Sequence, residues 1–305
     1  MRVGFVYSDV YLKHRNPMGH PESAERLTSI VAALKASDYW GRLVHIAPRM
    51  ATREELLAVH TERHVDRMEG YVGYADPDTY VSEGSHEAAL YAAGGVIEAV
   101  DRAKAGEIDR AFCAVRPPGH HAEADRAMGF CIFNNIAVAA RHAQKIGYRR
   151  IFIVDFDVHH GNGTQHTFES DPDVYYMSTH QAHHYPGTGA HTERGTGAGL
   201  GATANYPMSG GAGDREYHMI YADVLPQLMR HFGPDMVLVS AGYDVLMQDP
   251  LAGIRITEEG IRFIVEATLC IPGVPVVYTL EGGYDLGALG ESVTQTVGIL
   301  LAYGR

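Results

Sequence analysis

The chain has 305 residues, of which 46% are hydrophobic and 20% charged, a composition that predicts a folded globular protein and excludes a disordered one. Its 25 Lys and Arg against 37 Asp and Glu give a net charge of −12, which argues against a general nucleic-acid binder because such proteins need a basic surface. An acidic surface favours cationic partners such as basic peptides or polyamines, although many cytoplasmic proteins are acidic without such a partner.

No apolar run approaches the about 20 residues of a membrane span, and the opening MRVGFVYS lacks the pattern of a signal peptide. The three cysteines, Cys113, Cys131 and Cys270, are too far apart to predict a disulfide framework or a cysteine-based zinc site. We therefore expect a cytoplasmic protein without membrane contact. Because no repeat or linker is evident, residues 1–305 are expected to form a single domain.

Short apolar segments alternate with helical patterns along the chain. In chain order the sequence predicts a strand at 2–8, helices at 21–37 and 86–105, a strand at 111–115, a helix at 134–147, a strand at 151–157, a helix at 215–231, a strand at 236–242, a helix at 257–270, a strand at 274–280 and a helix at 286–302. Pro21 in the first turn and the acidic Glu22 and Glu25 favour the first helix.

Several of the predicted strands are uninterrupted apolar runs, which are typical of parallel strands covered by helices on both faces. The alternation of strands and helices predicts a doubly wound α/β domain. Ligands of such domains bind beyond the carboxyl ends of the strands. Polar motifs follow the predicted strands at that position.

The first polar motif lies at the end of the strand predicted at 151–157. Asp155, Asp157 and His159 alternate with Phe156 and Val158, so that in an extended segment the three polar side chains share one side. Asp157 and His159 could then bind one divalent cation, for which they are suitable zinc ligands. A solvated strand end is the alternative. We favour the metal, because buried acids and histidines are costly without a metal or polar partners.

The strand predicted at 236–242 is followed by Tyr243 and Asp244, and Asp244 is the third candidate ligand. Alone, such a residue could be a helix cap or a turn residue. Two Asp and one His would leave coordination positions open for water and substrate, as catalytic zinc sites do.

Two further motifs follow the strands predicted at 111–115 and 274–280. In the first, prolines stiffen a loop that carries His120 and His121, and histidines near neutrality suit general acid–base catalysis. In the second, Tyr284 could donate a hydrogen bond to a developing oxyanion. Read alone, the histidine pair could be a surface or structural feature, and the tyrosine a packed turn residue.

Together, these segments resemble the histone deacetylase superfamily. The resemblance rests on HPES (20–23), RPPGHHAEADRAMGFCIFNN (116–135), DFDVHHGNGT (155–164), AGYD (241–244) followed by Asp249 and Pro250, and EGGY (281–284), which occur in the family's order. Their arrangement is closer to the class II and bacterial branch, which includes the acetylpolyamine amidohydrolases, than to class I. The resemblance implies a three-layer arginase/deacetylase fold with a mainly parallel, eight-stranded sheet and helices on both faces.

The resemblance also implies the metal content. Zn²⁺, with Fe²⁺ as the alternative ion, is expected to be held by Asp157, His159 and Asp244. The family also carries structural K⁺, and Asp155, Asp157, His159 and Ser178 match parts of the K⁺ site nearest the zinc.

The catalytic roles follow from the same resemblance. His121 matches the general base, and His120 matches its electrostatic or proton-donating partner, which Asp155 orients. Asn162 stands where class I carries Asp, a class II feature that should lower the basicity of His121 because an amide supports imidazolium less than a carboxylate does. Tyr284 matches the oxyanion tyrosine, and its presence favours real hydrolytic activity.

The substrate-binding residues are also implied. Phe130 and Tyr185 match the aromatic walls of the acyl-lysine tunnel, of which the second is usually Phe, and Gly129 matches the position whose carbonyl faces the substrate amide. Apolar Leu251 stands where a polyamine-specific branch carries Glu, and so suits a peptide-lysine substrate. Residues 76–110 leave no room for the long inserted loop of the bacterial polyamine enzymes.

The resemblance therefore implies hydrolysis of N-acetyl amides to acetate and a free amine, with acetyl-lysine in proteins or peptides as the expected substrate. The alternatives are an amidohydrolase acting on acetylpolyamines or other small amides, a binuclear manganese ureohydrolase of the arginase type, and a non-enzymatic acyl-lysine binding module. The ureohydrolase needs additional bridging carboxylates, and the binding module would lack the general base or Tyr284. Assembly of identical chains stays open.

Overall fold

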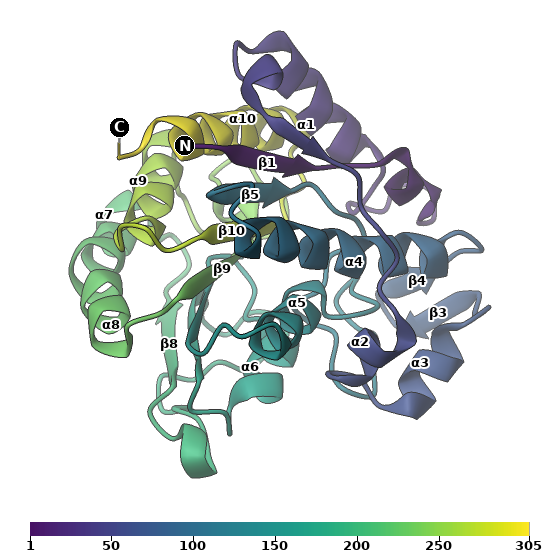
Figure 1. Cartoon of the computed structure of the whole chain (residues 1–305). Helices are drawn as coiled ribbons and strands as arrows, with labels where there is room; N and C mark the ends of the chain where they lie inside the picture. Colours follow the sequence, from purple (N-terminus) through teal and green to yellow (C-terminus); the bar gives the residue numbers. More distant parts are fainter. Residues whose placement is uncertain (305) are drawn as a thin grey trace.

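An eight-stranded sheet runs through the centre of the computed structural model, which describes residues 1–304 (Figure 1). The strand order is β2-β1-β5-β10-β9-β6-β7-β8, and every neighbouring pair is parallel. The strands are β1 (Val3–Val6), β2 (Val44–Ile46), β5 (Arg110–Cys113), β6 (Ile151–Asp155), β7 (Val174–Gln181), β8 (Thr203–Met208), β9 (Met236–Ala241) and β10 (Val276–Leu280). The predicted eight-stranded α/β fold is thereby confirmed.

Helices cover both faces of this sheet (Figure 1). Helix α4 packs against α5 on one face, while α10 packs against α1 and α9 on the other. The helices are α1 (Glu25–Ala36), α2 (Arg53–Leu57), α3 (Glu62–Met68), α4 (Ser85–Lys104), α5 (Asn135–Lys145), α6 (Asn162–Phe168), α7 (Asp214–Met219), α8 (Leu225–Phe232), α9 (Glu258–Thr268) and α10 (Leu286–Ala302). A two-stranded antiparallel sheet of β3 (Gly73–Asp76) and β4 (Thr79–Val81) lies outside the main sheet.

The central strands form as their sequences dictate. Strands β6, β9 and β10 are buried along their whole length because each has helices on both faces, and their branched apolar side chains suit a doubly covered parallel strand. Short polar side chains begin the helices: Asn134 caps α5 by accepting a hydrogen bond from the amide of Ala137 (3.1 Å), and Asp285 caps α10 in the same way. The carboxyl ends of β5, β6, β9 and β10 consequently meet along one edge, the carboxyl edge.

Some predicted elements differ from the structure. Helix α1 begins at Glu25 and not near Pro21, because the Glu22 side chain is buried in ion pairs instead of lying at the helix start. The helix predicted at 215–231 is interrupted by a π-helical segment at Ile220–Val224. Strands β2, β7 and β8 were not predicted; β2 is largely exposed, and β8 contains Asn205 and Pro207.

No helix within residues 1–304 combines the length and the apolar character that a membrane crossing requires.

Candidate active site

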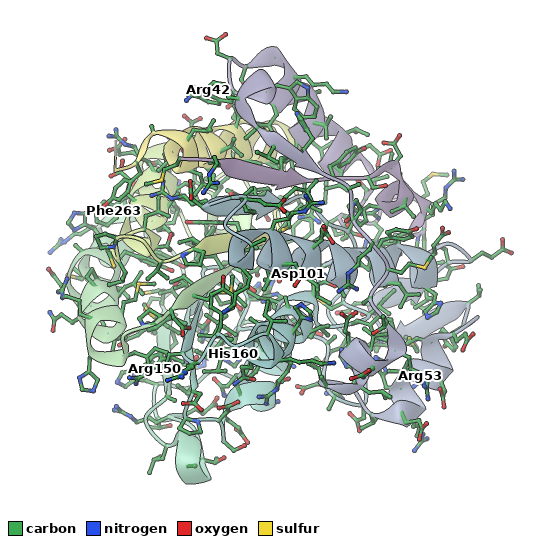
Figure 2. The ribbon with its side chains drawn as sticks, in the orientation of Figure 1. Arg42, Arg53, Asp101, Arg150, His160 and Phe263 are labelled. Atoms are coloured by element: carbon green, nitrogen blue, oxygen red, sulfur yellow. The ribbon has the colours of Figure 1, made fainter. Side chains whose placement is uncertain are left out.

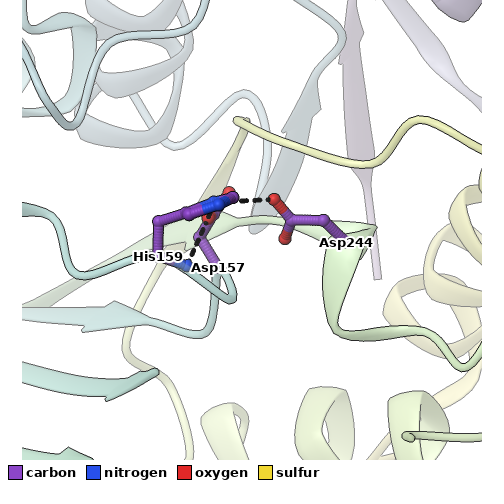
Figure 3. Close-up of side chains that lie close together, drawn as sticks. All are labelled: Asp157, His159 and Asp244. Carbon is purple, nitrogen blue, oxygen red and sulfur yellow. Dashed lines mark hydrogen bonds and ion pairs between the residues drawn. The ribbon is translucent and has the colours of Figure 1, made fainter. Parts of the chain in front are cut away.

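Three predicted metal ligands converge at the carboxyl edge of β6 and β9. Candidate donor atoms of Asp157, His159 and Asp244 all lie within 4.8 Å of one another, and all three residues are buried (Figure 3). The Nδ1 atom of His159 lies 3.1 Å from Asp157 Oδ1 and 3.2 Å from Asp244 Oδ2. Apart from this contact with His159, buried Asp244 Oδ2 has no hydrogen-bond partner within residues 1–304, which leaves it available to a cation. One imidazole and two carboxylates fit a zinc ion with open coordination positions.

Backbone amides fix both carboxylates. Asp157 accepts hydrogen bonds from the amides of His159 (2.9 Å) and Gly282 (2.8 Å), and Asp244 accepts one from Val158 (3.0 Å). Hydrogen bonds from groups that do not themselves touch the metal orient the side chains that do. A Cβ atom on Gly282 would lie 2.1 Å from Asp244 Oδ2, so this position requires glycine.

The adjacent histidines differ in their partners. His120 Nδ1 lies 3.0 Å from Asp155 Oδ2, whereas His121 Nδ1 lies 2.8 Å from Asn162 Oδ1. Burial opposes protonation of His120, but the carboxylates of Asp155 and Asp157 outweigh it and raise its pKa to about 10. Burial and the neighbouring imidazoles hold the pKa of His121 well below its usual value. His120 is therefore the charged partner and His121 the neutral one.

The tautomer of His121 follows from the amide beside it. Asn162 Nδ2 donates to Glu123 Oε1 (2.5 Å) and to the His121 carbonyl (3.3 Å), which leaves Oδ1 to accept the Nδ1–H of His121. The Nε2 atom then carries the lone pair. A neutral imidazole with a free Nε2 can accept a proton from water.

A cavity of about 230 Å³ opens at this edge of the sheet. Its lining residues are Asp78, Pro118, His120, His121, Gly129, Phe130, His159, His184, Tyr185, Leu251, Gly282 and Tyr284. The Phe130 and Tyr284 rings meet edge to face with centroids 6.0 Å apart, and Tyr185 meets His121 in the same way at 5.1 Å. All predicted substrate-binding residues, namely Gly129, Phe130, Tyr185 and Leu251, therefore line one cavity with the histidine pair.

Tyr284 is held at the cavity by contacts on both sides. Its amide donates to Asp249 Oδ2 (2.7 Å), and the guanidinium carbon of Arg26 lies 5.0 Å from its ring centroid. Arg26 also donates to the carbonyls of Gly283 (2.7 Å) and Glu281 (2.5 Å). Burial raises the pKa of Tyr284 well above its usual value, so its hydroxyl stays protonated and can act as a hydrogen-bond donor.

The comparisons agree with this geometry. The family model described as "Histone deacetylase domain" matches residues 20–300. The chain belongs to the histone deacetylase family. A probable deacetylase from Methanothermobacter thermautotrophicus is 43% identical over 297 residues, which are 94% of this chain and 87% of that protein. Histone deacetylase 15 from Arabidopsis thaliana is 40% identical over 291 residues, which are 92% of this chain and 53% of that protein.

The chain thus spans about half the length of the plant histone deacetylase it matches. The crystal structure of the HDA15 HD domain superposes with a TM-score of 0.95 at 38% identity, covering 98% of this chain and 91% of that one. Proteins can share a fold at much lower sequence identity than 38%, so this similarity supports the family assignment as well as the fold. Family membership supports deacetylase chemistry.

Sequence reasoning missed several residues of this histone deacetylase site. Buried Glu281 accepts hydrogen bonds from the amides of Gly119 (2.7 Å) and His120 (3.1 Å) and from the Ser240 hydroxyl (3.0 Å), and so ties the histidine loop to β9 and β10. Asp78 and His184 line the cavity from segments that carry no local motif. Glu281 belongs to the EGGY motif (281–284), which marks its position but not its role, whereas no motif contains Asp78 or His184.

The residues predicted for structural K⁺ lie on neighbouring strands. Ser178 of β7 is the register partner of Asp155 of β6, and the Asp157 amide donates to Asp155 Oδ1 (3.2 Å). The Ser178 hydroxyl lies 2.8 Å from His180 Nδ1. The K⁺ site itself stays a prediction.

Proposed function

We propose that this chain is a zinc-dependent deacetylase that hydrolyses N-acetyl amides, with acetyl-lysine in proteins or peptides as its substrate. The observation that carries the proposal is that the triad of Asp157, His159 and Asp244 adjoins a cavity which His159 itself lines together with His121 and Tyr284. Family membership supports the deacetylase chemistry, while the zinc ion, the substrate and the residue roles are inferred from geometry and chemistry.

The proposed metal ligands are Asp157, His159 and Asp244, with Fe²⁺ as the alternative ion. Zinc in this position supplies Lewis acidity, which polarises the acetyl carbonyl and makes the attacking water more acidic. The triad, the otherwise unpartnered Asp244 Oδ2 and the mixed nitrogen and oxygen donors support this assignment.

The chain's own residues then handle the protons and the developing charge. His121 takes a proton from water at Nε2 while Asn162 holds its Nδ1–H. Asp155 orients charged His120, which stabilises the negative charge near the carbonyl or protonates the leaving nitrogen. Tyr284 donates its hydroxyl hydrogen to the oxyanion. One water and one amide thereby give acetate and a free amine.

The cavity supports an acyl-lysine substrate. The Phe130 and Tyr185 rings can flank a four-carbon chain. Gly129 lies against the His121 ring, and Leu251 contributes an apolar side chain to the lining. Asp78 also lines the cavity and brings a carboxylate to it. That carboxylate favours an acetylpolyamine as the second candidate substrate, because it could attract a second cationic amine.

The deciding experiment is steady-state hydrolysis of an acetyl-lysine peptide and an acetylpolyamine, side by side, with and without a zinc chelator. We expect higher kcat/KM for the peptide and no turnover with the chelator. A preference for the polyamine would overturn the substrate but keep the mechanism. No hydrolysis of either compound by zinc-loaded protein would favour the acyl-lysine binding module.

Three further inferences accompany this proposal: structural K⁺ near Asp155, Asp157, His159 and Ser178, a cytoplasmic location, and the possibility of assembly between identical chains. The unpaired cysteines, two of them buried, fit a reducing compartment. Elemental analysis of the purified protein tests both the K⁺ and the choice between zinc and iron.

A further inference from the structure

A second hollow, about 250 Å³ in volume, lies beside the loop that follows the histidine pair. Its lining residues are Arg63, His64, Arg67, Asp125 and Arg126, and we call it the arginine hollow. Its volume is several times the roughly 30 Å³ that one water molecule takes in the liquid. Among five lining side chains, three are guanidinium groups, in a protein whose net charge is −12.

None of the three arginines of the hollow forms an ion pair of 4.0 Å or less within residues 1–304. Arg63 and Arg67 are four residues apart on α3 and so project from similar faces of it. The two acids of the same helix, Glu62 and Asp66, instead form ion pairs with Arg53 of α2, at 2.9 and 2.5 Å. Arg53 is labelled in Figure 2. Within residues 1–304, neither α3 arginine has an ion-pair contact of 4.0 Å or less, unlike Arg53.

Arg126 approaches from the Ala122–Met128 loop and likewise makes no ion pair in the described part of the chain. Asp125 is the one acid that lines the hollow, so three guanidiniums and one carboxylate leave a formal charge of +2. The guanidinium carbon of Arg67 lies 5.3 Å from the centroid of the Tyr71 ring, a cation–π contact. A cationic hollow of this kind suits a small dianion.

His64 lines the hollow with a buried imidazole. Its Nε2–H donates to the carbonyl of Ile132 (2.9 Å), and its Nδ1 atom is buried without a hydrogen-bond partner among the described residues. The polar groups that the hollow offers to an anion are therefore its guanidinium groups.

We propose that the arginine hollow binds a phosphate group, either inorganic phosphate or a phosphomonoester. The unprotonated oxygens accept charge-assisted hydrogen bonds from Arg63, Arg67 and Arg126. No covalent step is involved.

The hollow adjoins the proposed catalytic cavity through one short loop. Arg126 is three residues before Gly129, which lines that cavity, and the Arg126 carbonyl accepts a hydrogen bond from the Glu123 amide (2.9 Å). If the proposed deacetylase function holds, one source of the phosphate group is a phosphorylated residue near the acetyl-lysine of the substrate. The other source is free phosphate.

Calorimetric titration of the zinc-loaded protein with inorganic phosphate, at constant ionic strength, tests the proposal. We expect saturable binding that weakens about tenfold or more in Arg126→Gln and in Arg67→Gln, because each loses a charge-assisted contact. The control is Arg42→Gln: Arg42 is exposed, and its guanidinium carbon lies 5.8 Å from the centroid of the Tyr39 ring, much as Arg67 lies over Tyr71. Arg42 is not among the residues that line the hollow, and Figure 2 shows it well away from Arg53, the partner of α3.

The control should bind phosphate as the wild type does. Absence of saturable binding, equal weakening in Arg42→Gln, or unchanged binding in Arg126→Gln would each overturn the proposal, the last because phosphate would then occupy another site such as the metal. The titration needs no turnover, so it stands even if the deacetylase assignment fails.

A kinetic comparison separates the two sources. Acetyl-lysine peptides with Ser or phosphoserine at successive positions are compared with wild type and Arg126→Gln. A KM that falls severalfold with phosphoserine only in the wild type, at unchanged kcat, identifies a phosphorylated substrate. With saturable phosphate binding established, an unchanged KM identifies free phosphate as the ligand; both results support the hollow as a phosphate site.

Discussion

The two edges of the central sheet differ in kind. The carboxyl edge holds a cavity of about 230 Å³ at which buried acids and histidines converge. The opposite edge, where the strands begin, is called the amino edge. It holds a larger hollow of about 400 Å³ lined largely by apolar residues such as Leu269, Ile271 and Val274. The acid that lines it, Asp109, is paired with Arg2 at 2.8 Å. The candidate site is therefore distinguished by buried polar groups that lack a full set of hydrogen-bond partners, and not by the larger cavity volume.

The largest expected effect lies at the carboxyl edge. His159→Ala should abolish metal binding and reduce kcat/KM by more than the about 10–100-fold typical of groups that only orient a metal ligand. Elemental analysis and steady-state kinetics on the same preparation measure both. A variant with full zinc occupancy would show that His159 is not a ligand.

Tyr284→Phe should lower kcat by about 10²–10³-fold, because one hydrogen-bond donor to the oxyanion is lost. Its metal content and Tm should match the wild type, since the ring and the Arg26 contact remain. Retention of the wild-type rate would remove Tyr284 from the proposed mechanism.

Leu269→Ala tests the amino edge. Leu269 is buried, so its truncation should reduce the free energy of unfolding by about 2–5 kcal/mol, as measured by denaturant unfolding. Its kcat/KM at a temperature where the variant is folded should equal that of the wild type. A clear fall in kcat/KM would mean that the two edges are coupled and would break the comparison.

The smallest effect concerns pH. Burial and the neighbouring His64 lower the pKa of His60 to about 3. In the unfolded chain the His60 imidazole takes up a proton near pH 6.5, whereas in the folded protein it does so only near pH 3. The free energy of unfolding therefore falls as the pH falls from 6.5 toward 3, and the contribution of His60 to it is constant above pH 6.5. The stability difference between wild type and His60→Gln should therefore shrink by about 1.4 kcal/mol per pH unit below 6.

Denaturant unfolding of both proteins between pH 7 and pH 5 measures this difference. If it stayed constant over that range, His60 would titrate normally in the folded protein. His60 donates to the Glu123 carbonyl (2.9 Å) and accepts from the Asn134 amide (2.9 Å), so the test reports on the support of the carboxyl edge.

The sequence was most informative where local chemistry and fold coincide. Strands β6, β9 and β10 are predominantly apolar, and Asp157, Asp244 and Tyr284 follow them within a few residues, so both the sheet and the polar edge could be predicted. Strand β7 was missed because Ser178, Thr179 and His180 make it polar although it is buried.

The residues missed at the site have a different origin. Asp78 comes from the β3–β4 turn and Arg26 from α1, and each reaches the site only through tertiary packing. Arg26 and Arg116 both bind buried Glu22, a cluster in which every partner comes from a different segment or helical turn. The Arg26–Glu22 pair has the i,i+4 spacing of a helix, but Arg116 and Glu22 are 94 residues apart, so the cluster as a whole could not be predicted from one sequence.

The amino-edge hollow has a consequence for how the protein can be handled. Met1 and Gly304 both line it, so the two ends of the described chain lie near each other on the edge opposite the cavity (Figure 1). An affinity tag, a surface anchor or a fused domain at either end would therefore project away from the incoming substrate. Immobilisation through either end should leave the cavity facing solution.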